Sequence, residues 1–147
     1  MRLEEASYSS PEMVYFATLC ARDKGILFLD PELARAVVES LLWCRASDHF
    51  RIYAYCLMPD HLHIAVSPNE SGICLSKSVG VFKSYTTRES WKFGFTGQLW
   101  QRSWYDHIAR RDEDVIAICR YILENPLRKG LISESDEWPY SGMPDPL

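Results

Sequence analysis

Two apolar segments, Arg51 to Met58 and His61 to Val66, flank the dipeptide Pro59-Asp60, and no other feature of the sequence constrains the fold as strongly. Their aromatic and β-branched residues are typical of β-strands. Because two intervening residues leave room only for a tight turn, the two strands must form an antiparallel hairpin. Any fold proposed for this chain has to contain that hairpin.

The segments around the hairpin alternate between strand and helix patterns. The predicted elements are a strand over Met13 to Cys20, a helix from Asp30-Pro31 that fades near Ser47, a helix from Ile73 to about Trp91, a loop over Lys92 to Gly97, a strand over roughly Arg102 to Ala109, and a helix from Asp112 to near Asn125. The order β-α-β-β-α-β-α predicts an α+β fold of the ferredoxin-like (RRM-like) type, an antiparallel sheet with helices packed on one face.

The length of 147 residues fits a single domain, which we expect to span 1–147. Within it, residues 1–12 are expected to form a flexible arm and residues 131–147 an irregular tail. No apolar run approaches the roughly 20 residues that cross a bilayer, and the polar start does not resemble a signal peptide. The five cysteines form no C-x-x-C pair, so we expect reduced thiols in a cytoplasmic protein that does not associate with membranes.

The formal net charge is −4, but the charge is unevenly distributed. Residues 77–111 carry seven basic and two acidic side chains, and aromatic residues are interleaved with them. Basic groups that follow phosphates, together with aromatic rings that stack on bases, predict a surface for single-stranded nucleic acid. A solvated helix face followed by core aromatics is the alternative. The candidate DNA contacts are Lys77, Lys83, Arg88, Arg102 and Arg110.

The second strand of the hairpin carries the pair His61 and His63. Side chains alternate along a strand, so both imidazoles lie on one face, while Leu62 and Ile64 point into the opposite face. Two adjacent imidazoles on one face can bind a single metal ion. Two surface histidines on a half-exposed strand remain the alternative from spacing alone.

The last predicted helix places Tyr121 and Asn125 at positions i and i+4, on one helix face opposite Cys119 and Ile122. A phenol beside a carboxamide could supply a nucleophile and an oxygen ligand for a metal. A partly buried tyrosine and an asparagine that caps the helix before Pro126 would give the same pattern.

Five segments together resemble one known family. They are YAYCLMPDHLHIAV (53–66), FKSYTTR (82–88), LWQRSWYDHIARRDEDV (99–115), RYILENPLRKGL (120–131) and WPYS (138–141). In this order and spacing, the chain resembles the REP-associated tyrosine transposases, a branch of the single-strand transposases of the HUH superfamily. The resemblance covers nearly the whole chain.

The resemblance implies a role for each candidate residue. His61 and His63 match the metal ligands of the HUH motif, Asn125 matches the position that completes the metal site, and Tyr121 matches the catalytic tyrosine on the C-terminal helix. Arg128 flanks this site and is expected to contact DNA. Such enzymes use Mg²⁺ or Mn²⁺ and cut single-stranded DNA that carries hairpins. The tyrosine becomes joined to a 5′-phosphate, and a second 3′-OH can then accept the strand.

Two alternative functions stay open. The chain could be a domesticated protein that binds DNA hairpins without cutting them, or an HUH relaxase or replication initiator. Asp106 and His107 lie in a matching segment, where support of the site is favoured over direct metal ligation. Relatives of this branch are expected to be monomers, although dimers occur in the superfamily.

Overall fold

The computed structural model describes residues 13–47, 49–69, 74–110 and 113–147, with only the backbone described at 105–107, 109–110 and 113. The predicted arm, 1–12, lies outside this range. Five antiparallel strands form one sheet in the order β4-β1-β3-β2-β5. The strands are β1 (Met13–Cys20), β2 (Phe50–Met58), β3 (His61–Pro68), β4 (Tyr105–Arg110) and β5 (Ser141–Gly142). The α-helices are α1 (Pro31–Ala46), α2 (Leu75–Trp91), α3 (Glu113–Leu123) and the single turn α4 (Asn125–Arg128).

The predicted hairpin is confirmed. Strands β2 and β3 pair from Phe50↔Pro68 to Met58↔His61, and the turn between them contains only Pro59 and Asp60. Because β1 flanks β3 on its other side, β3 occupies the centre of the sheet. The histidine strand is therefore held by backbone hydrogen bonds along both edges.

The start of α1 also follows the sequence prediction. One carboxylate oxygen of Asp30 accepts hydrogen bonds from the backbone N–H groups of Glu32 and Leu33, at 3.0 and 3.1 Å. Pro31 occupies the first helical position, where a backbone N–H is not needed. The helix then packs along α2 and contacts β2.

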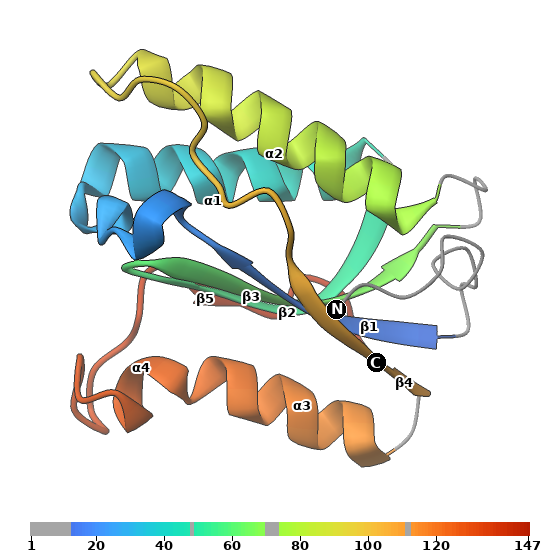
Figure 1. Ribbon diagram of the computed structural model, residues 1–147. Coiled ribbons are helices and arrows are strands. Elements are labelled where there is room, and N and C mark those ends of the chain that lie inside the picture. Colours follow the sequence, from blue (N-terminus) through green and yellow to red (C-terminus); the bar gives the residue numbers. More distant parts are fainter. Residues whose placement is uncertain (1–12, 48, 70–73, 111–112) are drawn as a thin grey trace.

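Helices cover both faces of the sheet, which corrects the expectation of helices on one face. Helices α1 and α2 lie on one side, and α3 and α4 lie on the other (Figure 1). The physical reason is the composition of the central strands, because β2 and β3 are almost entirely buried and need cover on both faces. Leu62 and Ile64 belong to the core beneath α1 and α2, whereas Cys56 and Ala65 belong to the core beneath α3.

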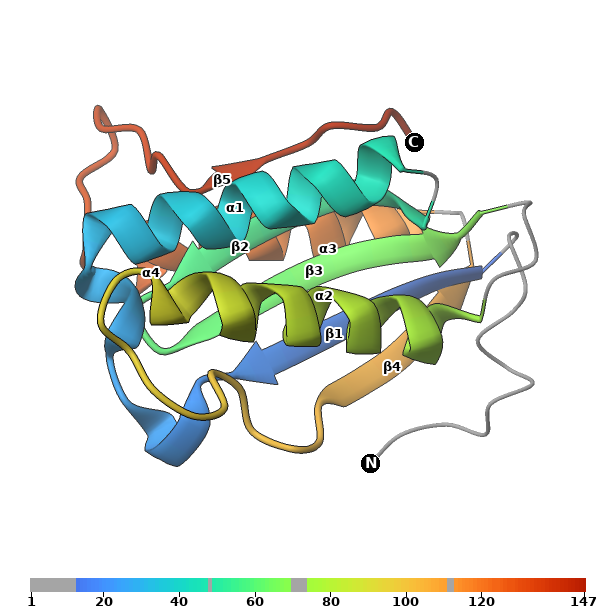
Figure 2. The same ribbon diagram turned by 90° about the horizontal axis from the view of Figure 1, so that it is seen from above.

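The C-terminal tail, residues 131–147, has no helix and contains one short strand that the sequence did not predict. Its short strand β5 pairs with Tyr55 and Cys56 at the edge of β2. Nearby, Trp138 donates from Nε1 to the carbonyl of Leu57 at 2.9 Å. These long-range hydrogen bonds fix a segment whose own sequence has no strand periodicity, and Figure 2 shows the tail running along that edge beside α1.

Asp145 fastens the end of the tail. Its carboxylate accepts two hydrogen bonds from Arg45 of α1, at 2.9 and 2.7 Å, and a third from the backbone N–H of Ile52 at 2.8 Å.

All five cysteines are free, as expected. Over the described residues, none of the helices is long and apolar enough to cross a membrane.

Candidate active site

His61 and His63 lie side by side on β3, as the alternation predicted. Their Nε2 atoms are 3.0 Å apart. Two ligands bound at about 2.1 Å in adjacent octahedral positions are separated by about 3.0 Å, so the two nitrogens already have the spacing of a shared metal ion. Their cross-strand partners, Met58 and Cys56, belong to the core beneath α3, which places the histidines on the α3 side of the sheet.

Each imidazole is held through its other ring nitrogen. Nδ1 of His61 contacts a carboxylate oxygen of Asp60 at 2.6 Å, and Nδ1 of His63 contacts the hydroxyl of Thr18 at 2.9 Å. A carboxylate only accepts, so in a neutral pair Nδ1 of His61 carries the proton and Nε2 presents its lone pair. His63 then donates from Nε2 to His61, and Thr18 donates to Nδ1 of His63.

The hydroxyl of Thr18 can serve either tautomer of His63. If Nε2 of His63 is to bind a metal, the ring proton must lie on Nδ1. Nδ1 then donates a hydrogen bond to the Thr18 hydroxyl oxygen. Thr18 lies directly opposite His63 in the pairing of β1 with β3. Sequence reasoning missed this residue because only the register between two distant strands brings it to the site.

The environment of His63 keeps its imidazole neutral. Burial, the neighbouring His61 and the Arg128 guanidinium lower its pKa to about 4. The ring of Phe16 also stacks on His63, with centroids 5.5 Å apart and planes at 19°. A neutral imidazole is the form that binds metals, so this environment suits a ligand.

Tyr121 and Asn125 lie on this same side of the sheet but differ in burial. The Tyr121 side chain on α3 is 53% exposed, whereas Asn125 is only 2% exposed. The helix does not run unbroken between them, since α3 ends at Leu123 and Asn125 opens α4. Helix α3 thus ends near Asn125, as predicted, and Pro126 lies in the first turn of α4, where proline is tolerated.

Arg128 connects the tyrosine and the asparagine. Its Nη2 donates to the backbone carbonyl of Tyr121 and to Oδ1 of Asn125, both at 3.0 Å. Its guanidinium carbon lies 3.8 Å from the centroid of the Tyr121 ring. The Nδ2 atom of Asn125 is buried and has no hydrogen-bond partner within the described structure. The spacing i, i+4, i+7 of these three residues is a signal for the cluster in the sequence. It went unused because Pro126 predicts a helix end before Arg128.

Most of the predicted DNA contacts lie elsewhere. Lys77 and Arg88 are exposed on α2, on the opposite side of the sheet from the histidines, and Arg102 is exposed in the segment that leads into β4. The side chain of Arg110 is not among those described. The structure therefore does not gather the six predicted basic residues into one cluster with the histidines.

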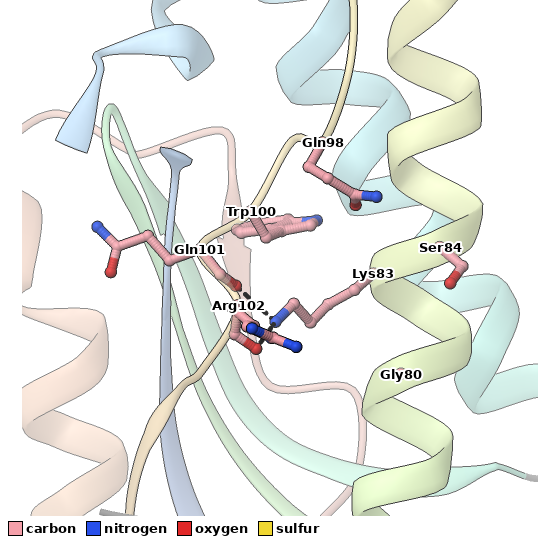
Figure 3. Close-up of a pocket in the computed structure, with 7 residues that line it drawn as sticks. All are labelled: Gly80, Lys83, Ser84, Gln98, Trp100, Gln101 and Arg102. Carbon is pink, nitrogen blue, oxygen red and sulfur yellow. Dashed lines mark hydrogen bonds between the residues drawn. The ribbon is translucent and has the colours of Figure 1, made fainter. Parts of the chain in front are cut away.

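Lys83 lines a pocket of about 460 Å³ between α2 and residues 98–102. Its ammonium donates to the backbone carbonyls of Gln101 and Arg102, at 2.7 and 3.1 Å (Figure 3). The indole of Trp100, also in the pocket wall, donates to the hydroxyl of Thr86 at 2.8 Å. These bonds give Lys83 a structural task, which is to hold the 98–102 segment against α2.

Asp106 and His107 lie on β4 opposite Ala17 and Phe16 of β1. Their side chains are outside the described part of the structure, so their supporting role stays a prediction. Among the described residues, no group of three or more His, Cys, Asp or Glu side chains is arranged to hold a metal. Within this part of the chain, the histidine pair is the one imidazole cluster with the spacing of ligands to a single ion.

Comparison with known proteins identifies the family. The family described as "Transposase IS200 like" matches residues 13–125. A REP-associated tyrosine transposase of Escherichia coli is 27% identical over 93 residues, which cover 63% of this chain and 53% of the relative. A Haemophilus influenzae protein, provisionally named REP-associated tyrosine transposase, is 29% identical over 102 residues, or 63% of this chain and 58% of the relative. The matches thus span little more than half the length of these two relatives.

A solved structure agrees with the fold. It is described as a REP-associated tyrosine transposase bound to a REP hairpin, and it superposes with a TM-score of 0.74 over 91% of this chain and 78% of that chain, at 21% identity. The α+β fold predicted from the order of elements is thereby confirmed, as is the resemblance to the REP-associated branch. The chain belongs to the IS200-like transposase family, and its relatives include REP-associated tyrosine transposases.

Proposed function

We propose that this chain cuts and rejoins single-stranded DNA, with Tyr121 as the nucleophile and a divalent metal, Mg²⁺ or Mn²⁺, held by His61, His63 and Asn125. The observation that carries the proposal is the convergence of the two Nε2 atoms, 3.0 Å apart, on the side of the sheet covered by the tyrosine helix. A binding module that never cuts DNA would not require this arrangement.

The donor set fits a divalent ion. Both histidines have an Nδ1 contact that leaves Nε2 for the ion, and the neutral state of His63 removes competition from protons. An amide oxygen is an acceptable ligand for Mg²⁺ and Mn²⁺. When bound, the ion supplies Lewis-acid polarisation of the scissile phosphate.

Tyr121 performs the covalent step. Its phenolic oxygen forms a bond to phosphorus while the bond from phosphorus to the 3′-oxygen breaks. The phenolic proton is lost to solvent, and the departing 3′-oxygen takes up a proton, which leaves a 5′-phosphotyrosine and a 3′-OH. A later attack by another 3′-OH reverses these bond changes and joins a new strand. The exposure of Tyr121 supports this role, because a long DNA substrate must reach the hydroxyl.

We further propose that the DNA is a hairpin-forming strand. The described relative in complex with a REP hairpin supports this substrate class. The exposed residues Lys77, Arg88 and Arg102 would contact the phosphates of the hairpin, and Arg128 lies beside the proposed cleavage site.

The test uses single-stranded hairpin DNA labelled at its 3′ end, since the tyrosine would retain the fragment downstream of the cut. Incubation with Mn²⁺ and separation on a denaturing gel should give a labelled protein–DNA adduct. Tyr121→Phe keeps the ring and should give no adduct while binding the hairpin normally. Tyr140→Phe, in another matching segment, is the control and should form the adduct.

The outcomes separate the alternatives. An adduct that persists in Tyr121→Phe would refute the role of Tyr121. Tight hairpin binding by the unaltered chain with no adduct under any divalent metal would favour a domesticated binding protein.

A further inference from the structure

Arg128 contacts both Tyr121 and Asn125, and binding to DNA phosphates would require neither contact. Tyr121, Asn125 and Arg128 lie at positions i, i+4 and i+7, and the contacts of Arg128 bring all three together across the junction of α3 and α4. One guanidinium donates to Oδ1 of Asn125 and to the Tyr121 carbonyl, and it covers the face of the Tyr121 ring.

The contact with Asn125 fixes the orientation of a buried amide. An asparagine side chain has an acceptor end and a donor end, and arginine can only donate. The guanidinium therefore sets Oδ1, the only end that can bind a metal, on its own side. A carbonyl oxygen has two lone pairs, so Oδ1 can keep the bond to Arg128 and still offer a lone pair to an ion.

The contact with Tyr121 restrains an exposed ring. With 53% of its surface accessible, Tyr121 is not held by core packing as Cys119 and Ile122 are on the other side of the helix. A cation 3.8 Å from the ring centroid supplies the missing restraint.

We propose that Arg128 is a positioning residue that holds the nucleophile Tyr121 and the metal-binding end of Asn125 in one geometry. This inference rests on the proposed function. It assigns Arg128 a role in the rate of the covalent step, whereas a residue that only contacts DNA would act on affinity.

The experiment compares Arg128→Met with Arg120→Met. Arg120 is exposed one residue before Tyr121, so its removal gives the same loss of charge on the same segment. At saturating hairpin DNA and Mn²⁺, Arg128→Met should form the adduct at least about tenfold more slowly than Arg120→Met. The two variants should bind the hairpin with similar affinity. Equal adduct rates in the two variants would overturn the proposal.

The Arg128→Lys variant tests whether charge alone is sufficient. Arg128→Lys keeps the charge but cannot combine the two hydrogen bonds with a flat stack on the ring. We expect it to bind DNA as the unaltered chain does and to recover less than half of the adduct rate. Full recovery would assign the effect to charge and overturn the positioning role.

A readout without DNA or metal completes the test. The chain has two asparagines, Asn69 and Asn125, so labelling with ¹⁵N-asparagine in an Asn69→Asp background gives the side-chain amide of Asn125 as a single NMR signal pair. That signal should move in Arg128→Met and stay in place in Arg120→Met. An unmoved signal in Arg128→Met would overturn the proposal, whereas a moved signal with no adduct from the unaltered chain would instead show that the proposed function is wrong.

Discussion

Replacement of Thr18 by valine tests the link between strand register and metal affinity. Valine has nearly the same shape but lacks the hydroxyl that contacts Nδ1 of His63 at 2.9 Å. In the metal-free protein the change removes one partly buried hydrogen bond, which should lower the free energy of unfolding by about 1 kcal/mol. In the metal complex, Nδ1 would carry a proton with no acceptor. Loss of such support weakens metal binding by about tenfold or more, equivalent to about 1.4 kcal/mol.

The assay is a titration with Mn²⁺ in the absence of DNA. Binding is measured by calorimetry or from the electron paramagnetic resonance signal of the free ion. Thr18→Ser is the matched control, because it keeps the hydroxyl and should retain most of the affinity. Thermal unfolding of both variants separates metal affinity from stability. If Thr18→Val binds Mn²⁺ as tightly as the unaltered chain, then Thr18 does not orient His63 as a ligand and the tautomer argument is wrong.

Three further expectations follow from the described contacts. Asp145→Ala removes the bonds to Arg45, which should cost about 2 kcal/mol of stability at neutral pH in thermal or urea unfolding. Because the Arg45 hydrogen bond lowers the pKa of Asp145, this contribution should be present at neutral pH and lost as the pH falls below about 4, so the variant and the unaltered chain should converge in acid. Replacing Arg88 and Arg102 together by glutamine should lower the slope of log K for DNA binding against log salt by about 0.7 per lost phosphate contact, and an unchanged slope would locate the DNA surface elsewhere. Lys83→Met should instead mainly lower the unfolding temperature, because Lys83 holds the 98–102 segment. Chelation of divalent ions should stop adduct formation and leave hairpin binding in place, and an adduct formed in excess chelator would rule out a metal requirement.

The parts of the fold set by local chemistry could be predicted from sequence. The two-residue turn fixed the β2–β3 hairpin, alternation along β3 put His61 and His63 on one face, and Asp30 capped α1 as expected. In each case the deciding interaction lies within a few residues of the motif. Local patterns of this kind can be predicted from sequence because no distant segment is needed to form the structures that they specify.

The parts that depend on distant segments could not be predicted. The pairing of β2 with β3 shifts register between Ile52 and Ala54, so Tyr53 and Ala54 both belong to the core beneath α3. This irregularity changes which positions of β2 face each layer of helices, and strict alternation cannot anticipate it. The position of the tail is a similar case, because Asp145 is held by Arg45 of α1, a hundred positions earlier in the chain.

The separation of the basic residues from the histidines limits how DNA can occupy both. Arg88 lies on the α2 layer and the histidines lie beneath α3, with the sheet between them. At the β2 edge, β5 and the rest of the tail stand between the two layers. At the other edge, Arg102 ends the 98–102 segment that Lys83 holds against α2 and lies just before β4. Under the proposed function, a DNA strand that reaches from Arg88 to the histidines would meet the tail at the β2 edge and Arg102 at the β4 edge. The long backbone segment that links α2 to β4 runs along this side (Figure 2), and it carries Arg102.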